Sequence, residues 1–209
     1  LNEFMDGKRR AFPRFYFMSA ADLLDVLSNG NNPARVVPLF PKFFNAIEKY
    51  DLVYPMGPDR RPAATGMHAC IGKEYVPFPE QLMLMGKVEV YLDRCIQAFR
   101  GALRHFTQED LAEYAAHNCA TEGVARGQWL MGVKAAQCAL LVQLITWVNL
   151  VEGAFADVEN EGAVSGAWAQ QQQLLLALIK LTMTDLDKPQ RQKVMCAITL
   201  DAHNRDVQE

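Results

Sequence analysis

Apolar side chains recur at helical spacing along most of the chain. A 3.6-residue period covers residues 87–106, and Thr107 is expected to cap a separate helix behind it. The next helix is expected over residues 128–158, with a length of roughly 40–45 Å for a rise of about 1.5 Å per residue. Its apolar face is marked by six residues: Leu141, Leu144, Val148, Val151, Phe155 and Val158.

The two ends of the chain also predict helices. Ser19 is a suitable N-cap for a helix that ends at Asn29-Gly30, behind an aromatic run around Pro13 that we expect to be extended. Four aromatic and aliphatic residues then predict a helix that begins at Pro41: Phe43, Phe44, Ile47 and Tyr50. Toward the C-terminus, helices are expected over 167–183 and from Asp187 to the chain end.

Residues 51–85 have a different character, because they are short runs of strand formers separated by turn signals. The turn signals are Pro55-Met56-Gly57-Pro58 and Gly72-Lys73. A sheet of this size needs a helical body to pack on. The sequence therefore predicts a mainly α fold, an elongated helical bundle with a small β-hairpin or meander around residues 51–85. The expected parts are 1–50, 51–85 and the long-helix bundle of 86–209.

The charges are unevenly spread along the chain. The 209 residues carry a net charge of −3, and 22% are charged, which is ordinary for a globular domain and argues against a nucleic-acid binder. Residues 135–181 hold only five charged side chains: Glu152, Asp157, Glu159, Glu161 and Lys180. Four polar residues interrupt 135–151, so we expect helices buried in a bundle and no membrane partner. Residues 174–179 are expected to be mostly buried.

The five cysteines favour a reduced, intracellular chain. Their number is odd and no C-x-x-C is present. The sequence begins with Leu1-Asn2-Glu3-Phe4, without an initiator Met or an apolar signal region. We therefore expect it to be a piece of a longer protein.

The sequence contains no motif that supports catalysis. The segment from Gly66 to Glu74 fails as a phosphate-binding loop, because five residues separate its glycines and Glu74 stands in place of the required hydroxyl. A hairpin turn at Gly72 fits better. His117 and Cys119 lie two apart and would not face each other on a helix, and there is no zinc-type spacing or nucleophile elbow.

Basic residues occur at two places in the chain. They are Lys8, Arg9, Arg10 and Arg14, followed later by Arg60-Arg61. They are too few for strong nucleic-acid binding in an acidic chain, so a solvated face or a protein contact is favoured.

Several motifs resemble the linker region of dynein heavy chains. One is Phe12-Pro13-Arg14-Phe15-Tyr16-Phe17, followed by the acidic-Leu-Leu helix from Asp22. Others are Phe43-Phe44-Asn45-Ala46-Ile47, the hairpin segment Glu74-Tyr75-Val76-Pro77-Phe78, and Gly86-Lys87-Val88-Glu89-Val90-Tyr91-Leu92 with Tyr91 in place of the usual Trp. The last is the run His203-Asn204-Arg205-Asp206-Val207. These motifs follow the family order over nearly the whole chain, although residues 107–126 and 170–173 match poorly.

The resemblance implies a mechanical role, most similar to that of axonemal heavy chains of the outer-arm type. The family's linker is a helical arm over a ring of AAA+ modules, and ATP turnover in the ring bends and straightens it. This chain resembles the C-terminal half of that arm. It would hold no catalytic, metal or cofactor site, since ATP and Mg would bind in the ring of the parent chain. The implied partners are that ring, other dynein subunits and, through the parent chain, microtubules in a cytoskeletal, ciliary or flagellar location.

The family motifs also supply the candidate contact positions. These are Phe12, Pro13, Arg14, Phe15, Tyr16, Phe17, His203, Arg205 and Asp206. The hairpin over 64–78 and the basic run over 8–14 are candidate docking surfaces, and Gly123, Gly127, Gly132 and the joint at 160–166 are candidate compliant points. Two alternatives remain open: a helical adaptor that binds partner proteins, and a small enzyme that uses His117 and Cys119 or the Gly72-Lys73 region.

Overall fold

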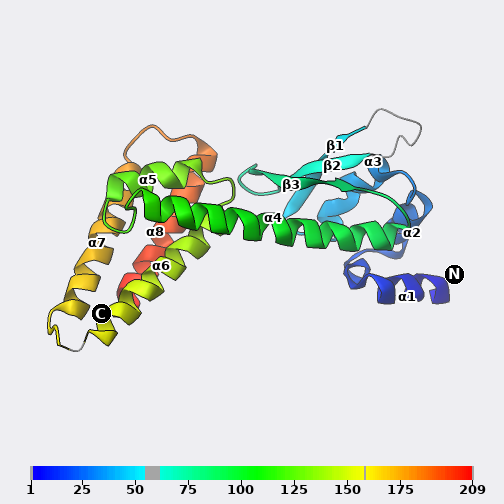
Figure 1. The fold of residues 1–209 in the computed structure, drawn as a ribbon. Coiled ribbons are helices and arrows are strands. Elements are labelled where there is room, and N and C mark those ends of the chain that lie inside the picture. The colour runs from blue at the N-terminus through cyan, green and yellow to red at the C-terminus, as the bar shows by residue number, and fades with distance from the viewer. Residues whose placement is uncertain (1, 55–61, 158, 209) are drawn as a thin grey trace. The chain divides into compact units, whose positions relative to one another are not determined.

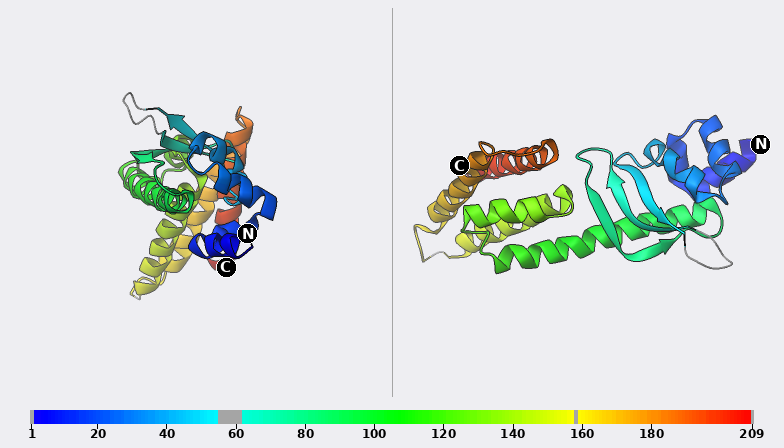
Figure 2. Two further views of the ribbon diagram at one scale, coloured as in Figure 1. Left: turned by 90° about the vertical axis from the view of Figure 1, so that its right-hand side faces the viewer. Right: turned by 90° about the horizontal axis from the view of Figure 1, so that it is seen from above.

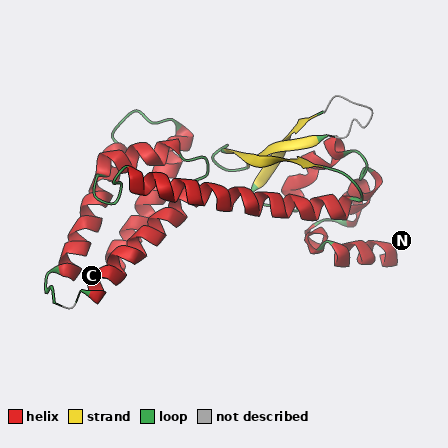
Figure 3. Ribbon diagram, in the orientation of Figure 1, coloured by secondary structure: helices red, strands yellow, loops and turns green. Residues whose placement is uncertain are grey.

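The chain folds into two compact units, residues 1–103 and residues 104–209. The computed structural model describes residues 2–54, 62–157 and 159–208. Helices dominate, and the strands are confined to one small antiparallel sheet (Figures 1 and 3). The predicted fold class, mainly α with a small β insertion, is confirmed.

The first unit begins with short helical segments. These are α1 (Asn2–Ala11), the 3-10 helix η1 (Pro13–Phe17), α2 (Ala20–Ser28), α3 (Pro33–Val36) and the 3-10 helix η2 (Val37–Lys42). Ser19 caps α2 as predicted, because its Oγ accepts a hydrogen bond from the Asp22 main-chain N–H at 3.1 Å. The extended conformation expected around Pro13 is wrong. Proline at the first helical position fixes a helical φ, and the Met18 N–H closes the turn on the Phe15 carbonyl.

The sheet contains strands β1 (Ile47–Val53), β2 (Ala63–Ala69) and β3 (Tyr75–Met83), paired antiparallel in the order β1-β2-β3. The predicted meander is therefore present, and β1 begins four residues before the expected position 51. Gly72 and Lys73 form the β2–β3 turn with φ of 75° and 53°. The turn signal Pro55-Met56-Gly57-Pro58 lies outside the described residues. The three-part domain division stays a prediction.

The helix predicted from Pro41 to Tyr50 is wrong, because Ile47 and Tyr50 belong to β1. A register shift between Ile47 and Lys49 lets Ile47 and Tyr50 both face the core, although these two residues stand three apart in the chain. Three residues is also a helical interval, so the bulge produces the same spacing as a helix. Tyr50 then packs edge-on against Phe40 and Phe78, at centroid distances of 4.8 and 5.3 Å.

The longest helix is α4 (Val88–Ala116), an unbroken run of 29 residues. In the first unit, its Phe99 ring packs against Phe44 at 5.1 Å, and the sheet covers this part of the helix (Figure 2, right). The predicted helix break at Thr107 is wrong. Phe106, Asp110 and Tyr114 are buried at intervals of four residues, so burial continues on one face past Thr107.

The second unit adds four helices to the end of α4. They are α5 (Gly123–Gly132), α6 (Ala136–Ala156), α7 (Ala163–Leu181) and α8 (Lys188–Gln208). The single helix predicted over 128–158 is wrong, because Val133 and Ala135 are extended and separate α5 from α6. Both residues are buried, so their packing in the core stabilises the break between the two helices. The helix predicted from Asp187 is confirmed as α8, whereas α7 begins four residues before the predicted 167.

The core of the second unit draws side chains from all five helices. Its buried members include Tyr114, Trp129, Leu130, Val142, Leu178, Val194 and Ala197. Within residues 174–179, Leu174, Leu175 and Leu178 are buried, but Leu176 and Ile179 are exposed, so the predicted burial holds for one face of α7.

Helix α6 is the one helix, among the described residues, that is long and apolar enough by length and composition to cross a membrane. This is weak evidence for a membrane span, because the core helix of a soluble protein passes the same test. Only 22% of its most apolar stretch is buried. The expectation that other helices cover this charge-poor helix therefore holds only for its first eight positions, where its buried residues lie.

Helices α5 and α7 approach closely at Gly123, where a Cβ atom would collide with the Cβ of Ala177. We expect Gly123→Ala to destabilise the chain by about 1–3 kcal/mol, because overpacking forces the helices apart. Gly132→Ala is the control: a Cβ there meets no atom within 4 Å, and alanine favours a helix, so its effect is neutral or stabilising. Urea unfolding of both variants measures the difference. Equal stability would mean that the helices do not pack this closely.

Candidate functional site

The aromatic segment at residues 12–17 divides into a buried side and an exposed side. Phe12 and Phe15 are 2% and 0% exposed, whereas Tyr16 and Phe17 are 62% and 74% exposed. A 3-10 helix has three residues per turn, so residues 12 and 15 share one face. The two buried rings lie 4.9 Å apart in an edge-to-face arrangement. Phe12 and Phe15 are therefore core residues, while Tyr16 and Phe17 are available for contact.

Arg14 holds the segment in place from the side. Its guanidinium donates to the Phe43 carbonyl at 3.3 Å and lies 5.3 Å from the centre of the Phe44 ring. Pro13 is exposed and contributes the helical φ described above. Arg14 and Pro13 therefore have local structural roles that the sequence did not predict.

The basic run over 8–14 is largely engaged within the first unit. Lys8 donates to Glu89 of α4 at 2.6 Å, and Arg9 pairs with Asp6 at 3.2 Å and lies 6.0 Å from the Tyr16 ring. Arg10 is exposed. The predicted pair Arg60-Arg61 lies outside the described residues. The run thus presents fewer free charges than its sequence indicates.

The C-terminal motif lies on α8, and the predicted residues there are mostly at the surface. His203 and Asp206 are exposed, and Arg205 is half-buried and pairs with its neighbour Asp206 at 2.5 Å. The buried members of the same run are Asp201 and Asn204, each 1% exposed. They continue the apolar spacing of Val194 and Ala197, so they face the core.

Asp201 forms a buried ion pair that the sequence analysis missed. The guanidinium of Arg126 on α5 donates to both carboxylate oxygens, at 2.6 and 2.8 Å. Burial alone lowers the pKa of Arg126, but the hydrogen bonds and charge of Asp201 raise it above its ordinary value. The sequence did contain one indication of this pair, because Asp201 continues the helical spacing of the buried residues of α8. Its partner lies in the region of poor family resemblance, 75 residues away.

Further polar side chains lie near the Arg126–Asp201 pair, between α5, α6 and α7. Gln143 and Gln171 are buried and, with Arg126, line a cavity of about 320 Å³. Within the described part of the chain, neither amide atom of Gln143 has a hydrogen-bond partner. The centre of the second unit therefore combines an apolar core with a polar layer around the Arg126–Asp201 pair.

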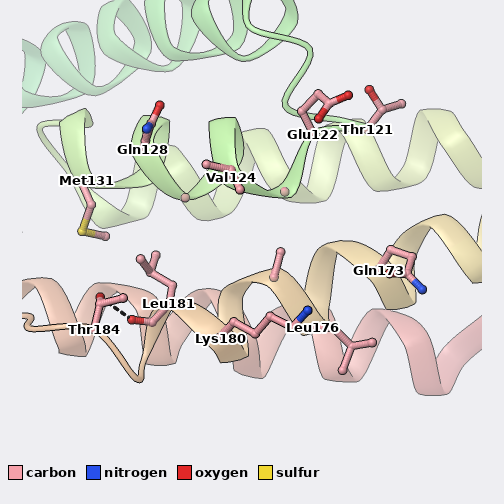
Figure 4. A pocket seen from close by; sticks show the side chains of 13 residues that line it. Thr121, Glu122, Val124, Gln128, Met131, Gln173, Leu176, Lys180, Leu181 and Thr184 are labelled. Atoms are coloured by element: carbon pink, nitrogen blue, oxygen red, sulfur yellow. Dashed lines mark hydrogen bonds between the residues drawn. The ribbon is translucent and has the colours of Figure 1, made fainter.

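A larger hollow lies between α5 and α7 and measures about 580 Å³ (Figure 4). Val124, Met131, Leu176 and Leu181 supply apolar lining from both helices. This apolar lining would suit contact with the apolar surface of another molecule or segment.

The residues weighed for catalysis do not come together as a site. Cys119 is buried, and burial raises the pKa of its thiol, which opposes the thiolate that a nucleophile needs. His117 is exposed, and its Nδ1 lies 2.8 Å from the Glu113 carbonyl. Lys73 pairs with Glu48 at 2.6 Å. In the described ranges, no group of three or more His, Cys, Asp or Glu side chains could hold a metal ion.

Comparison with known proteins gives the same family for the whole chain. A family model described as dynein heavy chain, N-terminal region 2, matches residues 1–110. The dynein alpha chain of the flagellar outer arm from Chlamydomonas reinhardtii is 44% identical over 99% of this chain and 4% of its own length. The ciliary dynein beta chain from Tripneustes gratilla and human dynein axonemal heavy chain 17 are each 37% identical, with the same coverage.

The chain belongs to the dynein heavy chain family. The resemblance stated from its motifs is confirmed, and the matched region covers 99% of the chain. The chain spans about 4% of the length of these dynein heavy chains. The exposed candidates for contact in this dynein segment are thus Pro13, Tyr16, Phe17, His203 and Asp206.

We expect Asp201→Asn to destabilise this dynein segment by about 3–5 kcal/mol, because it leaves the Arg126 charge buried without its partner. Asp206→Asn is the matched control on the same helix. Because this carboxylate is exposed, its loss should change the free energy of unfolding by about 0.5 kcal/mol or less. The measurement is urea unfolding at neutral pH. Replacing both partners, as in Arg126→Met with Asp201→Leu, should restore most of the loss. A similar loss in the double variant would contradict this account.

Asp110 predicts a pH dependence of stability. Burial, together with the negative charge of Glu113, raises the pKa of its carboxyl from 3.8 to about 6, against the opposing charge of Lys134. The folded state thus binds this proton more tightly than the unfolded state, so the free energy of unfolding falls as pH rises from about 4 to 6. We expect Asp110→Asn to stabilise the chain by about 2 kcal/mol at pH 7.5 and to have little effect near pH 4. Urea unfolding at both pH values tests this, and a loss of stability at pH 7.5 would show that the carboxylate is favourably paired.

Proposed function

We propose that this chain is a mechanical linker segment of a dynein motor heavy chain, a lever that transmits ATP-driven changes of the AAA+ ring. The observation that carries the proposal is α4. Its 29 residues form one helix of roughly 43 Å for a rise of about 1.5 Å per residue. Residues of α4 belong to both compact units. A lever needs such a stiff element, because force applied to a flexible segment would be lost in bending.

Packing supports the same role in each unit. In the first unit, the sheet and the aromatic cluster brace α4 through Phe99. In the second unit, Phe106 and Tyr114 of α4 are buried, and α5 is tied to α8 by the Arg126–Asp201 pair. Densely packed interiors deform little under load. Of the compliant points predicted from the sequence, Gly132 and the joint at 160–166 stay proposed, whereas Gly123 packs closely against Ala177.

In this proposal the segment performs no chemistry of its own. ATP and Mg bind in the ring of the parent chain, and microtubules are reached only through that chain. The ring of the same heavy chain and other dynein subunits are the partners, with the exposed Pro13, Tyr16, Phe17, His203 and Asp206 as contact positions. The relatives are flagellar, ciliary and axonemal dyneins, which supports a cytoskeletal location in a cilium or flagellum.

Gly101 offers a matched test of the lever. It lies inside α4, is exposed, and a Cβ there meets no atom within 4 Å. Gly101→Pro removes a helical hydrogen bond and kinks the helix at a cost of about 3 kcal/mol or more, whereas Gly101→Ala strengthens it. In the full heavy chain, we expect Gly101→Pro to lower the microtubule gliding velocity per ATP hydrolysed, while Gly101→Ala leaves it unchanged.

The readouts are ATP turnover and gliding velocity of the two motors. Unchanged ATP turnover shows that the Gly101→Pro motor is folded and that its ring still works. Equal gliding per ATP in the two variants would overturn the lever. It would favour the adaptor hypothesis, in which the segment binds partners without transmitting force.

A further inference from the structure

The cavity of about 320 Å³ beside the Arg126–Asp201 pair belongs wholly to the second unit. Its walls come from four helices, with Tyr114 on α4, Arg126 on α5, Gln143 on α6 and Gln171 on α7. Binding pockets for small molecules in proteins begin at about 300 Å³. The cavity therefore has the size of a site for a small ligand.

The walls of this cavity carry buried polar atoms that are left unpaired. Gln143 and Gln171 are 1% and 2% exposed. In the part of the chain that the structure describes, both amide atoms of Gln143 and the Nε2 of Gln171 have no hydrogen-bond partner. The same holds for the Nε1 of Trp147 and the Nε of Arg126. Buried polar groups in proteins are normally paired, so several unpaired ones around one cavity indicate a ligand that pairs with them.

Other polar groups of the same walls form their hydrogen bonds within the chain. The Gln170 side chain donates from its Nε2 to the Ala120 carbonyl at 2.8 Å. Thr146 donates from its Oγ1 to the Val142 carbonyl at 2.9 Å and is hydrogen-bonded to Tyr114. The fold thus satisfies the neighbours of the unpaired atoms. The lack of partners is specific to the groups named above.

The kinds of atom left unpaired define the chemistry of the ligand. The unpaired atoms are N–H donors on Gln143, Gln171, Trp147 and Arg126, together with one acceptor, the Oε1 of Gln143. A ligand that satisfies them needs a carbonyl oxygen for the donors and an adjacent N–H for the acceptor. A carboxamide has both, and two carboxamides can pair side by side through two hydrogen bonds. The complementary group is therefore a carboxamide.

Charge and apolar surface define the rest of the ligand. Among the residues that line the cavity, all of them described, Arg126 is the only charged one. Its charge is already balanced by Asp201, at 2.6 and 2.8 Å, so a charged ligand would lose its hydration without gaining a counter-charge. Trp147, Leu150 and Leu174 supply apolar and aromatic wall. A neutral molecule with an apolar, ring-shaped body fits this wall.

We propose that this cavity binds a small neutral aromatic carboxamide. Its amide pairs with the Gln143 side chain, its carbonyl oxygen also accepts from Gln171 or Trp147, and its ring lies against Trp147 and Leu174. The ligand bridges α6 and α7 next to the ion pair that joins α5 to α8. The site goes beyond the lever and does not depend on it.

Photoaffinity labelling of the full heavy chain tests the site. The probe is 4-azidobenzamide, and the labelled peptides are identified and quantified by mass spectrometry. We expect labelling of the peptides that line the cavity around Tyr114, Trp147 and Leu174. Excess benzamide should lower this labelling tenfold or more, whereas benzoate, which has the same size but carries a negative charge and no N–H, should leave it unchanged.

Two substitutions on α6 locate the amide contact. Gln143→Leu removes the proposed partner and should lower the labelling tenfold or more. Gln137→Leu is the matched control, because Gln137 is exposed on the same helix and does not line the cavity. Limited proteolysis of the heavy chain, with unchanged cleavage within residues 104–209, shows that each variant is folded. Gln171→Leu repeats the test from α7 and should also lower the labelling.

Each other outcome overturns the proposal. Absence of labelling in these peptides would mean that the cavity takes up only solvent. Equal competition by benzoate would mean that the carboxamide is not the recognised group. Labelling that survives both Gln143→Leu and Gln171→Leu would mean that the probe makes only apolar contacts. None of these results affects the Gly101 test, so the site and the lever stand or fall separately.

Discussion

The second unit depends on one constraint: Arg126 and Asp201 are buried away from water and must pair with each other. Two opposite charges, each almost completely buried, must meet with good geometry, because either one alone would be strongly destabilising. The two hydrogen bonds fix α5 against α8 in one register. Apolar packing alone tolerates sliding and repacking, whereas a bidentate pair does not. Among the described residues, buried amide atoms of Gln143, Gln171 and Asn204 have no hydrogen-bond partner, so within this polar layer it is the Arg126–Asp201 pair that fixes the arrangement.

Aromatic packing has the corresponding role in the first unit. Phe12, Phe15, Phe40, Phe43 and Phe44 meet mostly edge to face at centroid distances of 4.7–6.3 Å. Through Phe44 and Tyr50 the cluster reaches Phe99, so the short helical segments and the sheet share one core with α4. The family motif around Pro13 is thus first a folding element. The side chains of this motif that remain available for contact are the exposed ones, Pro13, Tyr16 and Phe17.

The candidate site is a set of surfaces, and burial sorts the residues proposed from the sequence. Of the nine motif positions, Phe12 and Phe15 are core and Arg14 is engaged with Phe43 and Phe44. The remaining positions are at least partly exposed. The C-terminal motif could be located from the sequence, but the choice of His203, Arg205 and Asp206 passed over Asp201 and Asn204. Those two residues are the ones that face inward, and the spacing from Val194 and Ala197 was the signal for them.

From the sequence alone we could predict the family, the helical character, the position of the small sheet, the turn at Gly72-Lys73 and the helix from Asp187. Each of these follows from local spacing, turn residues or motif order. The tertiary structure decided where α4 ends, where α5 breaks from α6, and that Ile47 and Tyr50 form a strand. It also decided which aromatic rings are exposed and that α6 is left uncovered beyond its first turns. The physical reason is that local spacing shows only that residues share a face. Whether that face is buried depends on partners such as Arg126 and Asp201, which lie 75 residues apart and meet only in the fold.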